Sequence, residues 1–169
     1  MELEEAIRNR RTHKAYGPEP VDPEVLAELL DLARWAPNHN LTNPWRFRVL
    51  GPGALDRLER AAGPEAGPKL RRAPTLVAVS VLTSPDPVAA AEDRDASAIA
   101  AYIVLLAAHG RGLAGYWRTP AVLREPAGRE ALRIDEGELV LGLLHLGTPR
   151  HEPRAPRRAP AQDVVTWLD

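Results

Sequence analysis

Residues 89–113 read AAAEDRDASAIAAYIVLLAAHGRGL, and they form the longest helical candidate in the chain. The first turns of this stretch are charged, whereas its middle, from Ile99 to Ala108, is apolar on almost every side. A helix that lacks a polar face is buried in its protein. We therefore expect this helix to lie at the centre of the domain or across a subunit interface.

Three apolar stretches around this helix are predicted to form strands. Residues 76–82 (LVAVSVL) and 139–146 (LVLGLLHL) are nearly continuous apolar runs, and the second ends in a Gly-Thr-Pro turn at 147–149. Such runs are typical of buried strands. Residues 45–50 (WRFRVL) alternate between large apolar and charged side chains over most of their length, which indicates a half-buried strand.

Helices are also predicted between and before these strands. A long one has a capping residue in Asp22 and a favourable first residue in Pro23, and it ends before Pro37. Shorter helices are expected at 3–9 and 54–62. The chain contains no internal repeat, so we expect a single α+β domain that spans residues 1–169.

The C-terminal stretch differs from the rest of the chain. Residues 150–160 are rich in proline and arginine and are expected to be extended rather than packed. They lead into an apolar end, VVTWL at 164–168. An apolar segment after a stiff polar one suggests docking, so we expect residues 150–169 to form an arm that packs on a partner subunit.

The composition restricts the classes of function. A chain of 169 residues with 44% hydrophobic residues can fold around its own core. The formal net charge of -1 gives no overall field toward nucleic acid or an anionic membrane. No apolar run approaches the roughly 18 residues of a membrane span, and the acidic start (MELEE) lacks the plan of a secretory signal. We expect a cytoplasmic protein that, having no cysteine, would need a cofactor for redox chemistry.

The first candidate site is the basic segment RRTHK at 10–14. Guanidinium groups and a hydroxyl are the donors that a phosphate group prefers. Lysine is rare in this chain, at positions 14 and 69 alone, which makes Lys14 notable. A solvated basic turn is the alternative interpretation of the same residues.

Two further segments could contact a planar ligand. Residues 35–45 (WAPNHNLTNPW) hold three of the four asparagines, an imidazole and two indole rings, which suit a heterocycle with many hydrogen-bonding edges. The alternative is a loop whose asparagines make turns and whose tryptophans fill the core. Residues 110–120 (GRGLAGYWRTP) could bring glycine backbone close to a ligand, or could form a helix cap followed by a strand.

Other standard site patterns are missing from the sequence. It contains no GxGxxG, no P-loop and no HExxH motif. The five histidines show no metal-ligand spacing, so we expect no metal site. The acidic cluster at 92–95 is expected to be a charged helix start rather than an acid/base pair.

Taken in order, these segments resemble the nitroreductase family of FMN-dependent oxidoreductases, in its short, compact branch. The family motifs have counterparts here in RRTHK (10–14), APN (36–38), NPWRF (43–47), GLAGYW (112–117) and GTP (147–149). The resemblance covers nearly the whole chain. It implies a nitroreductase-like fold, with a central, mostly antiparallel sheet flanked by helices, in an intertwined homodimer with FMN sites at the subunit interface.

The resemblance also implies roles for single residues. Arg10 and Thr12 would hold the FMN phosphate with Arg11 nearby, and Lys14 would face N1 and the C2 carbonyl of the flavin. Trp35 and His39 would reach the flavin edge of the other subunit. Trp117, Arg118 and Thr119 would pass the flavin ring, with the Thr119 amide as the expected partner of N5.

No side chain is expected to be catalytic in the covalent sense, because the flavin carries the chemistry. A tail arginine would assist at the phosphate, and Arg158 is the candidate among four (Arg150, Arg154, Arg157 and Arg158). The implied reaction passes a hydride from NAD(P)H to a small electron-poor acceptor, such as a nitro compound or a quinone, by a ping-pong mechanism.

Two alternatives to this function stay open. Relatives in the family also perform reductive dehalogenation, dehydrogenation and flavin fragmentation, and nothing in the sequence excludes these. A non-enzymatic protein that binds nucleic acid through the arginines of 150–158 is the other reading. The net charge and the lack of an accompanying nucleic-acid motif argue against it, and we expect no nucleic-acid partner.

Overall fold

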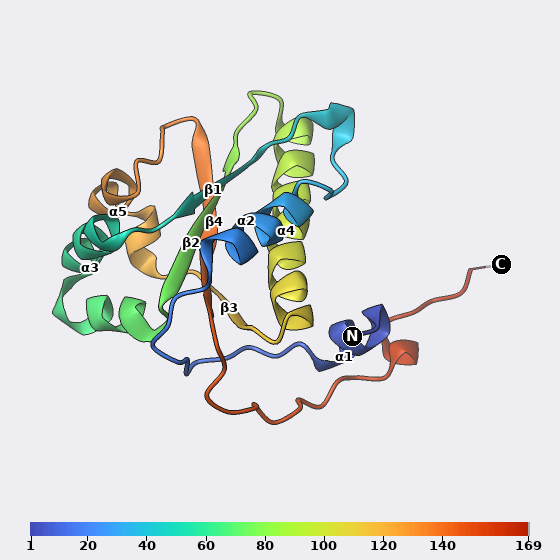
Figure 1. The fold of residues 1–169 in the computed structure, drawn as a ribbon. Coiled ribbons are helices and arrows are strands. Elements are labelled where there is room, and N and C mark those ends of the chain that lie inside the picture. The colour runs from blue at the N-terminus through green and yellow to red at the C-terminus, as the bar shows by residue number, and fades with distance from the viewer. Residues whose placement is uncertain (169) are drawn as a thin grey trace.

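The protein is built around a four-stranded antiparallel sheet (Figure 1). A computed structural model describes residues 1–168, so Asp169, at the end of the expected arm, lies outside the described residues. The strand order is β1 (Trp45–Val49), β2 (Thr75–Leu82), β4 (Glu138–Gly147), β3 (Ala114–Arg118), and every pair is antiparallel. The three predicted strands are therefore confirmed as β1, β2 and β4.

Helices cover both faces of the sheet (Figure 1). On one face lie α2 (Pro23–Ala33) and α4 (Pro87–Gly110), which pack on β2 and β4 through one hydrophobic cluster. On the other face lie α3 (Pro52–Ala66), α5 (Pro126–Ala131) and the short helices η2 (Gly67–Arg72) and η3 (Ala121–Arg124), over a second cluster. This arrangement confirms the α+β architecture.

The predicted capping signals operate as expected at α2. The Asp22 carboxylate accepts hydrogen bonds from the backbone N–H groups of Glu24 (2.8 Å) and Val25 (3.4 Å), and Pro23 is the first helical residue. These bonds satisfy donors that a helix N-terminus leaves free. The N-terminal helix α1 (Leu3–Asn9) is also present as predicted.

The long central helix is confirmed, but it is not buried on all sides within one chain. Its inner face, which includes Ala100, Val104 and Ala108, is fully buried against the sheet and α2. Its outer face leaves Ile99 and Tyr102 exposed. The helix ends at Gly110, and Gly112, just beyond the C-cap, has a φ of 75° that is favourable only for glycine. The Leu113 N–H bonds back to the Ala108 carbonyl at 2.9 Å, so this stretch is a helix cap followed by strand β3.

The other side of the sheet holds elements that the sequence patterns did not indicate. The helix expected at 54–62 extends over Pro52–Ala66, with a break at Gly63, where φ is 76°. The helices η2, η3 and α5 were not predicted, because each is too short to show an apolar period.

The C-terminal residues are extended, as predicted, and carry one short helix, η4 (Ala161–Asp163). Beyond η4, Trp167 and Leu168 are each 90% exposed. These two side chains are therefore almost free of packing contacts within residues 1–168. No helix among residues 1–168 has the length and apolar character needed to cross a membrane.

Candidate functional site

The basic segment lies at the end of the sheet where β4 finishes and β3 begins. Thr12 forms an isolated parallel bridge with Gly115, and the His13 N–H donates to the Gly115 carbonyl at 3.1 Å. Tyr16 then bridges to Pro149, just after β4. The segment is thus a strand-like addition to the sheet, and its alternate side chains point to opposite sides.

One side of this segment forms a small pocket rich in cations. The pocket encloses about 10 Å³ and is lined by seven side chains: Lys14, Tyr16, Lys69, Arg72, Tyr116, Arg118 and His145. Lys14 and Lys69 are the chain's only lysines, and they lie 55 positions apart (69 − 14) in the sequence. Lys69 and Arg72 come from η2 and Arg118 from the end of β3. No carboxylate belongs to this lining, so four cations converge without a counter-charge from the described chain.

A buried histidine forms part of the same pocket. His145, on β4, is 1% exposed, and its Nε2 has no hydrogen-bond partner within the described chain. Burial, with further contributions from Arg118 and Arg72, lowers the pKa of His145 to about 4. The imidazole is therefore neutral near pH 7. Buried polar atoms in proteins are nearly always paired, so an unpaired one beside four cations indicates a place for a ligand or a water molecule.

The pocket also holds a tyrosine that stays protonated. The Tyr16 hydroxyl donates to the His13 carbonyl at 2.8 Å, and burial raises the pKa of Tyr16 well above its ordinary value. The phenol therefore bonds within its own segment, while its buried ring packs in the hydrophobic cluster on the α3 and α5 side of the sheet. The positive character of the pocket comes from lysine and arginine alone.

The phosphate candidates occupy different environments. The Arg10 guanidinium is half-buried, with its carbon 5.8 Å from the centre of the Tyr102 ring, and Thr12 is exposed. The Arg11 guanidinium donates to the carbonyls of Arg8 (2.6 Å) and Arg10 (3.1 Å), so part of its hydrogen-bonding capacity is used by the backbone. The Arg10 guanidinium likewise donates to the Arg11 carbonyl at 3.1 Å, so each arginine spends part of its donors on the backbone, whereas the Thr12 side chain is exposed.

Arg11 and His13 line a second, larger cavity of about 500 Å³ between α1, the end of α4 and residues 149–155. Burial is the main cause that lowers the pKa of both His13 and His109, and Arg10 contributes to both shifts. No group of three potential metal ligands occurs in the part of the chain that the structure describes.

Within one chain, the segment around His39 lies on the opposite side of the molecule from the η2 segment, which lines the cation pocket (Figure 1). Its asparagines mainly shape the loop. The Asn38 side-chain oxygen accepts from the Asn43 N–H (2.9 Å), and the Asn43 amide donates to the Leu41 carbonyl (2.7 Å). Trp45 belongs to the core, whereas Trp35 is 72% exposed. The turn-forming interpretation of the asparagines is thus confirmed.

The side chains at the end of β3 point to different sides of the sheet. Trp117 turns toward the α4 side, where its Nε1 donates to the Leu141 carbonyl at 3.1 Å. A Cβ at Gly142 would lie 2.2 Å from that nitrogen, so the close packing of the Trp117 indole on β4 requires glycine at this position. Arg118 turns the other way, into the cation pocket, and donates to the Lys69 carbonyl at 3.1 Å. Thr119 is exposed beyond the strand.

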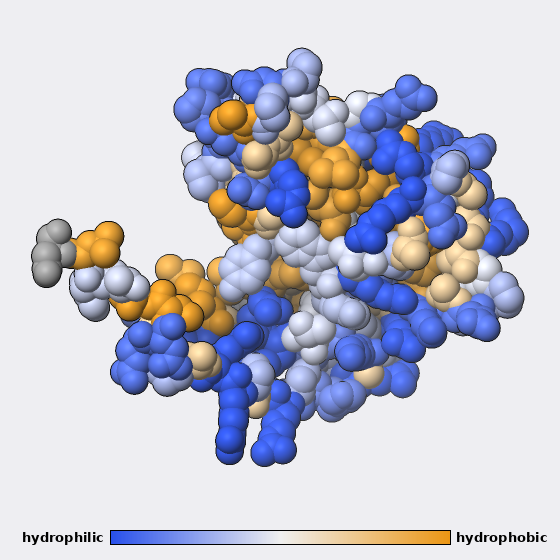
Figure 2. All heavy atoms as spheres, turned by 180° about the vertical axis from the view of Figure 1, so that it is seen from behind, coloured by the Kyte–Doolittle hydropathy of each residue, from blue (hydrophilic) through white to orange (hydrophobic). Residues whose placement is uncertain are grey.

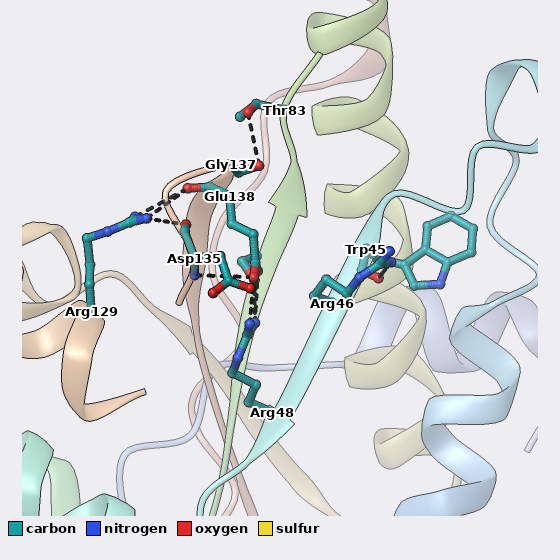
Figure 3. Close-up of polar contacts among 9 residues, drawn as sticks. Trp45, Arg46, Arg48, Thr83, Arg129, Asp135, Gly137 and Glu138 are labelled. Carbon is teal, nitrogen blue, oxygen red and sulfur yellow. Dashed lines mark hydrogen bonds and ion pairs between the residues drawn. The ribbon is translucent and has the colours of Figure 1, made fainter. Parts of the chain in front are cut away.

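A second buried polar cluster lies on the α3 and α5 face of the sheet (Figure 3). The Glu138 carboxylate accepts two hydrogen bonds from Arg48 (2.8 and 2.6 Å) and one from the Ser80 hydroxyl. Burial by itself raises the pKa of Glu138, but the bonds from Arg48 and Ser80 outweigh it and hold the pKa below its ordinary value. Because its partners are all internal, this cluster is structural.

The structure adds three residues to the candidate site that sequence reasoning missed, namely Lys69, Arg72 and His145. The scarcity of lysine, which drew attention to Lys14, applies equally to Lys69. No local signal marks His145, which occupies one position in a predicted buried strand.

Comparison with known proteins gives consistent results. The chain matches the Nitroreductase family over residues 7–67. The Escherichia coli (strain K12) protein YdjA, provisionally named an NAD(P)H nitroreductase, is 30% identical over 164 residues, covering 89% of this chain and 90% of that protein. The solved structure of a nitroreductase-like family protein from Bacillus cereus has a TM-score of 0.91 at 24% identity, covering 100% of this chain and 97% of that one. A provisionally named nitroreductase from Desulfovibrio desulfuricans, solved in complex with FMN, has a TM-score of 0.83 at 26% identity, covering 100% and 98%.

Proposed function

This chain belongs to the nitroreductase family, and we propose that it is an FMN-dependent oxidoreductase that passes a hydride from NAD(P)H to a small electron-poor acceptor. Its 30% identity with YdjA over 89% of the chain carries the family assignment. The single structural observation that carries the functional proposal is the pocket in which both lysines of the chain meet Arg72, Arg118 and His145, whose Nε2 has no partner among the described residues.

The pocket itself has room for about one water molecule, and the donor set around it suits the polar edge of a flavin that lies over its mouth. A flavin presents carbonyl oxygens and ring nitrogens that accept hydrogen bonds, and lysine and arginine are donors only. When bound, FMN supplies the hydride chemistry that no side chain of this cysteine-free protein can supply. Lys14 is proposed to face N1 and the C2 carbonyl, where its fixed charge favours the negative charge of the reduced state.

Arg10 and Thr12 are proposed to hold the phosphate, with Arg11 in a supporting position. The exposure of the Thr12 side chain and the half-exposed Arg10 support this assignment. An arginine fork gives a phosphate two parallel hydrogen bonds, which fixes orientation as well as adding affinity. Arg158 is the tail residue proposed to assist, and it is exposed within the single chain.

Beyond the pocket, Arg118 and Thr119 are proposed to line the path of the ring. Arg118 contributes a cation that its bond to the Lys69 carbonyl holds in place. The Thr119 backbone N–H is the proposed donor to N5, because Pro120 has no N–H to offer. Trp117 contributes through its packed indole, which fixes the end of β3 from the α4 side.

We propose that the working unit is a homodimer in which Trp35 and His39 complete the partner's site. Within one chain both residues are exposed, and neither belongs to the lining of the cation pocket. Apolar side chains on α1 and on the outer face of α4 are exposed as well (Leu3, Ile7, Ile99 and Tyr102). Figure 2 shows apolar surface gathered on the back of the molecule and along the projecting tail. Exposed apolar area of this kind favours association, and residues 150–169 are proposed to dock on the partner.

In the proposed ping-pong order, the nicotinamide and the acceptor use the same open side of the site in turn. The chain's own groups bind and orient both molecules, and none of them needs to act as a nucleophile. We further propose that the protein acts in the cytoplasm.

An absorption spectrum of the purified protein, repeated on the supernatant after heat denaturation, tests the cofactor. A yellow protein that releases FMN, with the phosphate identified by chromatography, is the expected result. Bleaching under argon by NADPH or NADH then identifies the donor. A colourless protein that takes up no added FMN would remove the central proposal.

A further inference from the structure

The segment of residues 38–43 presents side chains outward from an unusual backbone. Asn40, Leu41 and Asn43 have positive φ values of 52°, 53° and 47°. A leucine in this conformation is rare, because its Cβ is crowded there. The Leu41 side chain is nonetheless 77% exposed, and His39 beside it is exposed as well. The backbone conformation is therefore maintained for what the segment presents, rather than for packing in its own core.

The shape of this segment is fixed by bonds within it and with its near neighbours. Asn38 and Asn43 bond across the loop, the Thr42 N–H donates to the His39 carbonyl (3.3 Å), and Arg46 donates to the Asn43 carbonyl (3.0 Å). None of these bonds attaches the segment to a distant element. These bonds fix the conformation of the loop but not its position relative to the rest of the protein.

A buried carboxylate on α4 attaches the loop of residues 38–43 to the rest of the domain. Asp93, on the second turn of α4, is 8% exposed, and its Oδ1 accepts a hydrogen bond of 2.5 Å from the Thr42 hydroxyl. Of the hydrogen bonds made by residues 38–43 in the described chain, this is the one that reaches beyond residues 36–46. Asp93 also differs from its neighbours in the acidic run, since Glu92 and Asp95 are exposed.

The surroundings of Asp93 make the bond to Thr42 specific. No ion pair within residues 1–168 includes Asp93, and Thr42 is its one side-chain partner there. A buried carboxylate needs compensation for the loss of water, so a single short, charge-assisted bond carries that compensation here. The carboxylate therefore holds Thr42 firmly, and with it the whole self-bonded loop.

We infer that Asp93 is a positioning residue, which acts through Thr42 to place His39 and Leu41 against the flavin of the partner subunit. This inference rests on the proposed function. The bonds within the loop fix its shape, and α4 would fix its distance from the partner subunit, because α4 also carries the exposed apolar side chains that are proposed to pack in the dimer. Small displacements of groups that position a substrate are costly in rate, on the order of a hundredfold per ångström in sensitive cases.

The test compares Thr42→Val, which removes the donor at nearly constant shape, with Thr42→Ser, which retains it. Asp95→Asn is a matched control, since it neutralises an exposed carboxylate two residues from Asp93. Hydrogen–deuterium exchange over residues 34–46 in the flavin-free protein reports the attachment directly. Steady-state kinetics with NADPH and 4-nitrobenzoate report its effect on the reaction.

Thr42→Val is expected to exchange faster over 34–46 and to lose about tenfold in kcat/KM for the acceptor, with FMN affinity within about twofold of wild type. Thr42→Ser and Asp95→Asn should behave like wild type. Faster exchange with unchanged kinetics would overturn the positioning role, as would unchanged exchange, or a Thr42→Ser variant that behaves like Thr42→Val. Failure of the wild-type protein to take up FMN refutes the proposed function instead, which separates the two outcomes.

Discussion

Two buried polar groups lie on the same face of the sheet and differ in one respect. Glu138 has a complete set of internal partners in Arg48 and Ser80, whereas the Nε2 of His145 has none within the described chain. A satisfied group contributes to the stability of the fold, and an unsatisfied one costs stability until something else binds it. The contrast separates a structural cluster from the proposed binding site on one face of the sheet.

The largest expected loss of stability comes from removing a hydrogen-bond partner of Glu138. Arg48→Ala leaves the Glu138 carboxylate buried without its charge partner and should destabilise the protein by about 3 kcal/mol. Urea unfolding followed by far-UV circular dichroism measures the change. The double variant Arg48→Met/Glu138→Leu should recover most of the loss, and a double variant as unstable as Arg48→Ala would show that packing, not charge, holds this region.

The buried imidazole of His145 should make the stability of the protein depend on pH. The folded-state pKa of His145, about 4, lies below the ordinary value of 6.5, so the unfolded chain takes up the proton first as pH falls. Stability is therefore complete above about pH 6.5 and is lost progressively toward pH 4. A pKa shift of this size corresponds to a loss on the order of 3 kcal/mol.

His145→Gln should flatten this part of the curve in chemical denaturation at a series of pH values. His13 and His109 have lowered pKa values as well and leave a residual slope. A slope identical in wild type and variant would mean that His145 titrates normally in the folded protein.

The cations above His145 should affect ligand affinity more than stability. Lys14→Ala is expected to weaken FMN binding about tenfold, or 1.4 kcal/mol, and to lower the reduction potential of the bound flavin. Fluorescence titration and a redox-dye equilibration measure the two quantities. Arg60→Ala, an exposed arginine on α3, serves as the charge control. An unchanged dissociation constant together with an unchanged potential would exclude Lys14 from the site.

The smallest effect is expected at Ser80. Ser80→Ala removes one neutral donor from Glu138 and leaves the two bonds from Arg48, so the loss should be about 1 kcal/mol. Thermal unfolding at pH 7 resolves a change of this size. A loss as large as that of Arg48→Ala would indicate that the hydroxyl, not the guanidinium, is the essential partner.

The sequence predicted the parts of the molecule that leave a local pattern. The Asp22-Pro23 cap, the apolar runs of β2 and β4 and the length of α4 each follow from neighbouring residues, and all are present. The helices α5 and η2 leave no such pattern, because a helix of one or two turns has no period to recognise.

The candidate site divides in the same way. Lys14 was identified from its basic neighbours, but the pocket unites it with Lys69, Arg118 and His145 from three other elements. The order of the strands in the sheet brings these residues together, and no short stretch of the sequence contains all of them. The proposed role of Trp35 and His39 depends on a second subunit, since a single chain does not bring them to the pocket.

The basic segment is attached to the sheet by few backbone contacts, and this has a consequence for the lifetime of the protein in the cell. Residues 12–17 join the sheet through two isolated bridges and a few backbone bonds, with α1 carried at their end. A ligand held by Arg10, Thr12 and Lys14 would add its binding energy to that weak join, since a ligand that binds only the folded state stabilises it. A newly made chain without its cofactor would then open first at its N-terminus and offer proteases a starting point. The supply of cofactor would in this way set how long each copy survives, as well as whether it is active.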